Sequence, residues 1–294
     1  MTIITSPSHI PVMPDEVLSF MQIKPSGTYI DGTCGLGGHS KAILSNLSNN
    51  GFLLGLDIDD EAIKVCRKNL SIINSNFHIE NKSYSNFPKV LSKLGIKKVD
   101  GILLDLGLSS LQLDSKSRGF SFMEDSKLDM RFNQKKGINA AEIINRSSMS
   151  ELADIMYYFG EERRSRLIAK KIFENRPIEK VHDLVSIIKK CTPPKNRNKT
   201  MARVFQSFRI AVNDELENLK KFMEKYIKYL KTGGKIIVIS FHSLEDRIVK
   251  HCFRDGSKSG EISILTKKPI VSSKMEQAIN SRSKSAKLRC AVKI

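Results

Sequence analysis

The chain has 294 residues, 40% of them hydrophobic, and its 49 Lys and Arg outnumber its 31 Asp and Glu, giving a formal net charge of +18 at pH 7. This length suits one large domain or two ordinary ones, and no window approaches the ~18 apolar residues of a transmembrane helix. The N-terminal sequence lacks a signal-peptide pattern and the five cysteines are scattered without a C-x-x-C pair, so we expect a cytoplasmic protein without a membrane partner, disulfide framework or metal site.

Apolar runs typical of β-strands recur along the chain at the spacing of β–α–β units. They cover Thr28–Asp31, Phe52–Asp57, Asn76–Glu80, Val99–Asp105 and Lys235–Ser240, and a late run covers Leu288–Val292. Helical spacing fills the gaps between the first four runs, at Ser40–Leu47, Asp60–Leu70 and Phe87–Leu94. The fourth and fifth runs contain continuous apolar residues, as do strands covered on both faces. The pattern predicts an α/β fold with a doubly wound, mostly parallel sheet.

More chain than one crossover requires separates Asp105 from the fifth strand. Its last part predicts a single helix, stopped by Gly233 and Gly234, whose apolar face consists of Leu216, Leu219, Phe222, Met223, Tyr226, Ile227 and Leu230. The preceding part is also predicted to be helical, with a capping box at Ser148 and Glu151 and helices near 152–159, 161–176 and 181–190. We therefore expect a ligand-binding domain of residues 1–105 and 212–294, interrupted by a helical substrate-recognition domain of residues 106–211.

A glycine-rich loop follows the first strand in the sequence YIDGTCGLGGHS, Tyr29 to Ser40, and Asp57 ends the second strand. Strand, glycine loop, helix, strand and acid is the order by which α/β folds bind an adenine nucleoside. A nicotinamide-linked oxidoreductase is disfavoured, because the third glycine of its fingerprint would fall at Ser40 and Asp31 would repel a pyrophosphate. S-adenosylmethionine, which has a cationic centre and no phosphate, suits Asp31 better. The alternative, a tight turn that binds no ligand, explains one or two of these glycines. It does not explain three glycines together with acids at Asp31 and Asp57.

The positive charge is unevenly distributed along the chain. Residues 1–100 contain 10 basic and 9 acidic side chains, residues 101–200 contain 19 and 13, and residues 201–294 contain 20 and 9. The excess therefore lies outside the part with the nucleoside-binding pattern. It predicts a polyanionic partner such as a nucleic acid, with a solvated lysine-rich surface as the alternative.

Five segments mix aromatic and charged residues in a way that neither a core nor a surface requires: RGFSF (Arg118–Phe122), LDMRF (Leu128–Phe132), YFGEERRSRLIAKKI (Tyr158–Ile172), RVFQSFRIAVNDEL (Arg203–Leu216) and SFHSLEDRIVK (Ser240–Lys250). Two strand ends are also candidates for a functional site. Asp105 ends the fourth strand and begins DLGLSSLQLD, which fits a loop where a substrate approaches a cofactor, or an ordinary turn. His242 follows the fifth strand, although a lone histidine is more often structural than catalytic. The adjoining Glu245, Asp246 and Arg247 are predicted to form a salt-bridged helix start rather than a catalytic group.

Taken together, these segments resemble one family from end to end: the bacterial cytosine-N4 methyltransferases of small-subunit ribosomal RNA (RsmH, formerly MraW). The matching blocks are HIPVM, DGTCGLGGHS, DLGLSSLQLD, RGFSF, LDMRF, YFGEER, RVFQSFRIAVNDEL, SFHSLEDRIVK and NSRSKSAKLR. The resemblance implies a class I methyltransferase fold with an inserted helical domain. It also implies that the cofactor S-adenosyl-L-methionine contacts Gly37, Gly38, His39, Asp57, Tyr84, Asp105 and Gln112. Tyr84, where other members have Phe, and Ser281, where proline is common, depart from the pattern.

The implied reaction is methylation of a cytosine N4 amine in 16S ribosomal RNA, with free RNA or the small ribosomal subunit as partner. Amino-group methyltransferases commonly have a D/N/S-P-P-Y/F motif after the fourth strand, but this chain has Asp105-Leu106-Gly107-Leu108. We therefore expect the catalytic groups among Asp105, Ser109, Ser110 and His242. The base would stack on Phe120, Phe122 or Phe241, and the phosphates would contact Arg118, Arg131, Arg203, Arg282 and Lys287.

The sequence also bears on the type of methylation and on whether the protein is catalytic. No cysteine follows Asp105 in its loop, which disfavours the covalent attack on a pyrimidine ring that carbon-5 methylation requires. A non-catalytic RNA-binding or ribosome-assembly protein that retains a nucleoside pocket is the alternative, and Gly37, Gly38, Asp57 and Asp105 argue against it. The oligomeric state, with a homodimer as one option, is left open by the sequence.

Overall fold

The computed structural model describes residues 10–294, apart from the side chains of Ser110 and Asp114, so His9 of the HIPVM block lies outside the described residues. The chain divides into two compact units. Unit 1 comprises the residues up to Ser109 together with Leu216–Ile294, and unit 2 is Ser110–Glu215. The predicted boundaries lie a few residues earlier, after residues 105 and 211. The chain directly after Asp105 still contacts the sheet, since the Leu106 amide donates to the Ile239 carbonyl at 3.0 Å.

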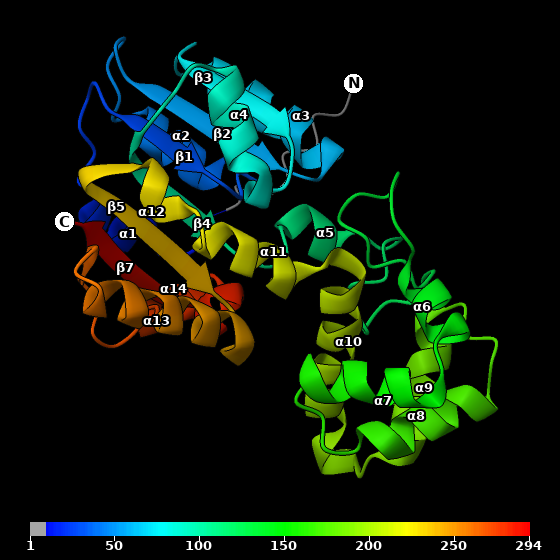
Figure 1. Cartoon of the computed structure of the whole chain (residues 1–294). Coiled ribbons are helices and arrows are strands. Elements are labelled where there is room, and N and C mark those ends of the chain that lie inside the picture. Colours follow the sequence, from blue (N-terminus) through cyan, green and yellow to red (C-terminus); the bar gives the residue numbers. More distant parts are fainter. Residues whose placement is uncertain (1–9) are drawn as a thin grey trace, which may run out of the picture. The chain divides into compact units, whose positions relative to one another are not determined.

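Unit 1 is built on a seven-stranded sheet with the order β3-β2-β1-β4-β5-β7-β6 (Figure 1). The strands are β1 (Thr28–Asp31), β2 (Phe52–Asp57), β3 (Phe77–Asn81), β4 (Val99–Asp105), β5 (Leu230–Ser240), β6 (Ile262–Ile264) and β7 (Lys287–Lys293). The first five pair in parallel, and β7 runs antiparallel to both β5 and β6. This arrangement confirms the predicted mostly parallel sheet of a class I methyltransferase fold.

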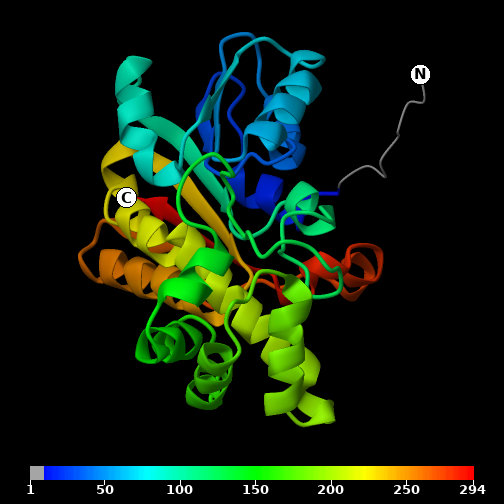
Figure 2. The same ribbon diagram turned by 90° about the vertical axis from the view of Figure 1, so that its right-hand side faces the viewer.

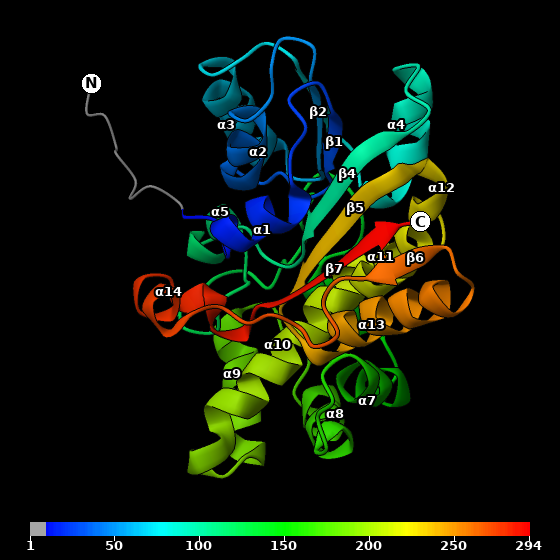
Figure 3. The same ribbon diagram turned by 90° about the vertical axis from the view of Figure 1, so that its left-hand side faces the viewer.

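Helices cover both faces of this sheet (Figure 3). Side chains of α1 (Pro14–Met21), α2 (Gly38–Leu44) and α3 (Asp60–Ser71) pack with Leu53, Leu103 and Ile237 in one apolar cluster. The other cluster joins Leu54, Ile102 and Ile236 to α4 (Phe87–Lys93), α11 (Glu215–Met223), α12 (Tyr226–Tyr229) and α13 (Ser243–Lys258). Neighbouring residues of β2, β4 and β5 thus enter opposite cores, which explains the continuous apolar runs 52–54, 102–104 and 236–239 within these strands.

One predicted helix is wrong. Residues 216–230 were expected to form a single helix stopped by Gly233 and Gly234, but α11 ends at Met223, and β5 already begins at Leu230. Leu230 pairs with Val99 and Lys235 with Gly101, so the residues between them bulge out of the ladder, where Gly233 adopts a left-handed φ of 76°. Pairing with β4 has overridden the helical period at this point.

Unit 2 contains helices, a long irregular segment of residues 115–139, and an isolated bridge between Lys127 and Lys180. Its helices are α5 (Ser110–Asp114), α6 (Ala140–Arg146), α7 (Met149–Tyr158), α8 (Ser165–Glu174), α9 (Val181–Cys191) and α10 (Arg197–Asn213), the last five of them seen in Figure 2 in green to yellow-green. The predicted capping box at Ser148 and Glu151 is confirmed at the start of α7. Among the described residues, no helix is long and apolar enough to cross a bilayer.

Candidate active site at the carboxyl edge of the sheet

The loop after β1 requires glycine at several positions for steric reasons. A Cβ on Gly32 would lie 2.4 Å from Leu104 Cδ2, and one on Gly37, whose φ is 93°, would lie 3.1 Å from Cys66 Sγ. Gly35 also has a positive φ, of 48°. The loop therefore takes a backbone path that side chains would obstruct, and it leads into α2 at the carboxyl edge of the parallel strands, where α/β folds bind ligands.

Asp57, at the end of β2, is half-buried beside this loop. Its Oδ2 accepts a hydrogen bond from the Gly35 amide at 2.8 Å, and its Oδ1 accepts one from the Asp59 amide at 2.9 Å. Burial raises the pKa of Asp57 to about 6, although these amide hydrogen bonds oppose the shift. The carboxylate is thus fixed in direction, and an ionised acid in this environment gains from additional hydroxyl donors.

The raised pKa of Asp57 predicts that folding stability and cofactor affinity change in opposite directions with pH. Between its ordinary pKa of 3.8 and about 6, the carboxyl binds a proton more tightly in the folded chain, so its contribution to stability falls as pH rises. Ligand hydroxyls prefer the ionised carboxylate, so affinity for S-adenosylmethionine should fall by up to about tenfold per pH unit below about 6. Calorimetric titrations between about pH 5 and pH 8 measure this change in affinity. The affinity of Asp57→Ala should not show the fall at low pH. An affinity of the unmodified protein that is independent of pH across this range would contradict it.

Asp31, His39 and Asp105 form a cluster at the ends of β1 and β4 and the start of α2. Asp31 is 1% exposed, and its carboxylate accepts hydrogen bonds from Ser40 Oγ at 2.6 Å and from the Thr33 amide at 3.2 Å. The His39 Nε2 and the Asp105 Oδ2 form an ion pair at 3.5 Å. Burial alone would lower the pKa of His39, but the neighbouring Asp105 and Asp31 outweigh burial and raise it.

Asp105 has an unused acceptor. Its Oδ1 is buried and has no hydrogen-bond partner among the described residues. Its backbone is held in place, since the Asp105 amide donates to Thr33 Oγ1 at 2.6 Å. Leaving a buried acceptor unpaired costs about 1–3 kcal/mol, which makes the Asp105 Oδ1 a candidate acceptor for a ligand donor.

Three loops of unit 1 converge near Asp105. A Cβ on Gly35 would lie 3.9 Å from Ser109 Cβ, so the loops after β1 and β4 are neighbours. A Cβ on Gly107, whose φ is 96°, would lie 3.4 Å from the Phe241 ring, which brings in the segment after β5. The structure thus places the predicted catalytic loop beside one predicted stacking residue, Phe241. Ser110 lies at the start of α5, and its side chain lies outside what the structure describes.

Tyr84 and Gly38 also border this edge. Tyr84 is half-buried in a short 3-10 turn (Tyr84–Asn86) after β3, and its ring meets Phe222 edge to face with centroids 5.7 Å apart. A Cβ on Gly38 would lie 3.1 Å from Pro11 Cβ, so the N-terminal segment closes over the start of α2. The structure therefore brings six of the seven predicted cofactor residues together in unit 1; Gln112 belongs to unit 2, where its side chain is buried.

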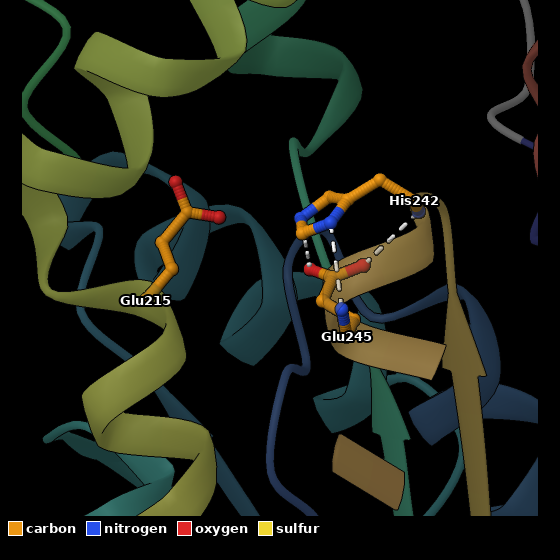
Figure 4. A group of neighbouring side chains, drawn as sticks. All are labelled: Glu215, His242 and Glu245. Atoms are coloured by element: carbon orange, nitrogen blue, oxygen red, sulfur yellow. Dashed lines mark hydrogen bonds and ion pairs between the residues drawn. The ribbon is translucent and has the colours of Figure 1, made fainter. Parts of the chain in front are cut away.

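His242 caps α13. Its Nδ1 accepts a hydrogen bond from the Glu245 amide at 3.4 Å, and its Nε2 lies 3.2 Å from Glu245 Oε1 (Figure 4). Asp246 binds Arg289 Nε at 2.6 Å, so the salt-bridged helix start predicted for this segment is confirmed. The Nδ1 of His242 is engaged at the helix start, whereas its Nε2 has no hydrogen-bond partner among the described residues, and the catalytic role of His242 stays a prediction. Glu215, also drawn in Figure 4, ends unit 2 and pairs there with Arg209.

The RNA contacts predicted in unit 2 differ in accessibility. Arg118 is 3% exposed and donates to the carbonyls of Arg131 and Phe132, so a phosphate contact would require this loop to open. Phe120 is also buried and stacks on Phe132, which makes it part of the core of unit 2.

The remaining predicted RNA contacts are more exposed. Phe122 is half-buried against Phe205, and Arg131 pairs with Asp129. Arg203 is exposed and lies 3.7 Å from Glu162. In unit 1, Arg282 and Lys287 are half-buried. The RNA contacts of all these residues stay predictions.

Sequence reasoning missed Thr33, whose hydroxyl ties the end of β4 to the glycine loop and so positions Asp105. Its position inside the DGTCGLGG block was the available signal. Sequence reasoning also missed Pro11 and Val12, which lie over α2, because an irregular N-terminal segment has no period that predicts its contacts.

The residues at this edge fit S-adenosylmethionine. The glycines let the loop pack closely against Leu104, Cys66 and Pro11, the Asp57 carboxylate beside it is fixed in direction and suits sugar hydroxyls, and Tyr84 has a flat ring at the neighbouring strand end. Asp31 and Asp105 add negative charge near the loop, which suits a cationic sulfonium and opposes a phosphate. The donor set therefore matches a nucleoside with a positive centre.

Comparison with known proteins identifies relatives along almost the whole chain. Residues 6–294 match the model of the MraW methylase family. A protein named ribosomal RNA small subunit methyltransferase H from Caldicellulosiruptor saccharolyticus is 47% identical, over 97% of this chain and 99% of the relative. Proteins of the same name from Kosmotoga olearia and Crocosphaera subtropica are 45% and 44% identical, over 98% and 96% of this chain and 98% and 88% of the relatives.

Proposed function

This chain belongs to the MraW methylase family, and we propose that it methylates the exocyclic N4 amine of a cytosine in small-subunit ribosomal RNA. It is a methyltransferase that uses S-adenosyl-L-methionine as methyl donor. The ribosomal RNA substrate is supported by the names of relatives that match the chain over nearly its full length. The cytosine N4 position is supported by the resemblance of the sequence motifs.

The observation that carries the proposal is the unpartnered Oδ1 of Asp105 at the point where three loops of unit 1 meet. An exocyclic amine has N–H donors, and a buried carboxylate oxygen is a strong acceptor for one of them. Phe241, on the neighbouring loop, offers a flat surface for the base ring. Ser109, in the same loop as Asp105, provides a hydroxyl group near this meeting point of the loops.

The chemical role of these residues follows from the weakness of the nucleophile. The lone pair of a cytosine amine is delocalised into the ring, so the nitrogen must become pyramidal before it reacts. When bound, S-adenosylmethionine supplies an electrophilic methyl group. Asp105, by accepting an N–H, favours the pyramidal geometry and stabilises the positive charge that develops on nitrogen. His39, paired to the other oxygen, keeps Asp105 oriented.

Transfer of radiolabelled methyl to small-subunit ribosomal RNA tests the proposal. Mass spectrometry of nucleosides from the product should find N4-methylcytidine, and RNA from cells lacking the protein should lack this modification at one position. A label on carbon 5 or on another base would contradict the proposed target. Cofactor binding without any methyl transfer, to free RNA or to small subunits, would favour the non-catalytic RNA-binding alternative.

Unit 2 is proposed to recognise the RNA substrate, and this gives a testable division of labour. Both apolar clusters of the sheet consist of unit 1 residues, so replacing residues 115–205 with a short flexible linker should leave a soluble protein. This variant should bind S-adenosylmethionine, more weakly if Gln112 contacts it, and should not methylate RNA. Calorimetry and the radiolabel assay measure the two properties separately. Retained methylation would show that unit 2 is not needed for substrate capture.

The form of the substrate and the location follow from the same proposal. Comparing free RNA with assembled small subunits in the radiolabel assay distinguishes the two substrate forms. With either substrate the protein would act in the cytoplasm, where ribosomes are assembled. A homodimer stays a prediction, which sedimentation of the purified protein tests.

A further inference from the structure

An apolar and basic surface projects from unit 1 between its last two strands. We call residues 265–286, which join β6 to β7, the β6–β7 segment. It contains the short helix α14 (Lys274–Ile279), drawn in orange-red in Figure 3. Met275 and Ile279, one helical turn apart on the same face of α14, are 76% and 65% exposed. Val271 is 59% exposed, and no residue of α14 is buried. The helix thus presents its apolar face outward.

The β6–β7 segment is held firmly despite this exposure. Ser272 Oγ donates to the Ser283 carbonyl at 2.7 Å, and both serines are buried. Asn280 Nδ2 donates to the Ile10 carbonyl at 3.1 Å, and Glu276 Oε1 accepts from the Met13 amide at 2.8 Å. A segment fixed by these polar contacts, of which the bond between Ser272 and Ser283 is buried, while its apolar side chains face solvent is organised to meet a partner.

Charge identifies the class of that partner. The β6–β7 segment has five basic residues, Lys267, Lys268, Lys274, Arg282 and Lys284, and one acid, Glu276, whose Oε1 is directed to the Met13 amide. All four lysines are exposed. Two copies of this face would repel each other, which disfavours self-association, whereas a polyanion gains from every lysine.

The location links this surface to the candidate active site within unit 1. Lys287, directly after the β6–β7 segment, pairs with Ser240 at the carboxyl end of β5, and Phe241 follows. The Pro11–Met13 stretch lies against Gly38 of the cofactor loop and also binds Glu276. A strand of RNA that delivers a nucleotide to this edge would therefore pass the segment.

We propose that the outer face of the β6–β7 segment binds unpaired RNA adjacent to the methylated cytosine. This inference rests on the proposed function and adds that the RNA next to the target cytosine is single-stranded when it binds. Lys274 and Lys284 neutralise phosphates, while Met275 and Ile279 cover the faces of bases or sugars. The faces of bases are accessible in single strands, whereas in a duplex they are covered by the neighbouring base pairs.

Two double variants of the full-length protein separate these contributions. The probe is a fluorescein-labelled single-stranded RNA of about 12 nucleotides, within the usual site size, and its binding is followed by anisotropy at several salt concentrations. Lys274→Gln with Lys284→Gln should reduce the log–log salt slope by about 1.4, or about 0.7 for each phosphate contact. Met275→Ser with Ile279→Ser should weaken binding roughly three- to tenfold without changing the slope, because apolar burial releases no counterions.

The matched control is Ile72→Ser with Lys68→Gln near the end of α3, where Ile72 is 80% exposed. Lys68 lies in the last turn of α3 and Ile72 follows that helix, which runs back from the carboxyl edge, so this pair should leave affinity and salt slope unchanged. The inference is overturned if the unmodified protein does not bind the probe, or if either test pair leaves its affinity and slope unchanged. It is also overturned if Met275→Ser with Ile279→Ser only converts a dimer to a monomer in sedimentation.

The radiolabel assay keeps the two proposals distinguishable. Methylation of cytosine N4 by a protein whose variants bind the probe normally would refute the surface and leave the proposed function intact. Conversely, suppose that the lysine pair lowers the salt slope and the apolar pair weakens binding while the unmodified protein does not methylate cytosine N4. That outcome would retain RNA binding by this surface and refute the proposed function.

Discussion

Asp57→Ala should weaken binding of S-adenosylmethionine at least about tenfold at neutral pH while the chain remains folded. The carboxylate is expected to accept both ribose hydroxyls in charge-assisted hydrogen bonds worth roughly 1.5–3 kcal/mol each. Losing even one such bond reduces affinity about tenfold. Isothermal calorimetry measures the change. Unchanged affinity in a folded variant would remove Asp57 from the cofactor site.

The hydrogen bonds that Asp57 accepts from Gly35 and Asp59 require a control for loosening of the turn. Asp59 caps α3 by accepting from the Glu61 and Ala62 amides, and its replacement by alanine should cost about 1 kcal/mol of stability. Asp59→Ala leaves the Asp57 oxygens in place and should bind the cofactor nearly normally. If it weakens binding as much as Asp57→Ala does, the loss comes from the turn and not from the ribose contacts.

The sheet and the edge residues of unit 1 could be predicted because their causes are local in sequence. β1, β2 and β4 have the predicted bounds, because each contains adjacent apolar residues that enter the cores and each ends at an acidic residue. Asp57 and Asp105 end two of these strands, and parallel topology brings such ends to one edge. The positions of the two acids therefore follow from the strand assignments alone.

Features that depend on distant contacts could not be predicted in this way. Arg118 and Phe120 belong to a motif rich in charge and aromatics, which suggested RNA contacts, but the fold of unit 2 buries both. The single helix predicted to reach Leu230 is interrupted after Met223, and Leu230 itself pairs with Val99 of β4. The Thr33 hydroxyl reaches across two loops to Asp105, a contact that neither periodicity nor composition encodes.

Asp105→Asn should produce the largest loss of turnover among single substitutions in unit 1, about 10²–10³ in kcat, the range seen when one stabilising polar group is removed from an active site. The amide keeps the shape of the side chain, and the backbone contact with Thr33 is unaffected. It removes the negative charge that should stabilise the developing positive charge on the amine nitrogen. Rapid-quench measurement of methyl transfer, with calorimetry of cofactor binding on the same variant, separates chemistry from affinity.

The comparison of these two losses assigns the role of Asp105. A carboxylate that acts on the amine is needed mainly during the reaction, so its loss should change kcat far more than the Kd for S-adenosylmethionine. Ser109→Ala is the matched control, because it removes a neighbouring polar group without removing charge and should have a much smaller effect on kcat. Equal losses of turnover and cofactor affinity in Asp105→Asn would make Asp105 a cofactor ligand only. The acceptor of the amine N–H would then be Ser109, Ser110 or a backbone carbonyl. A large loss of kcat in Ser109→Ala would identify Ser109 as that acceptor.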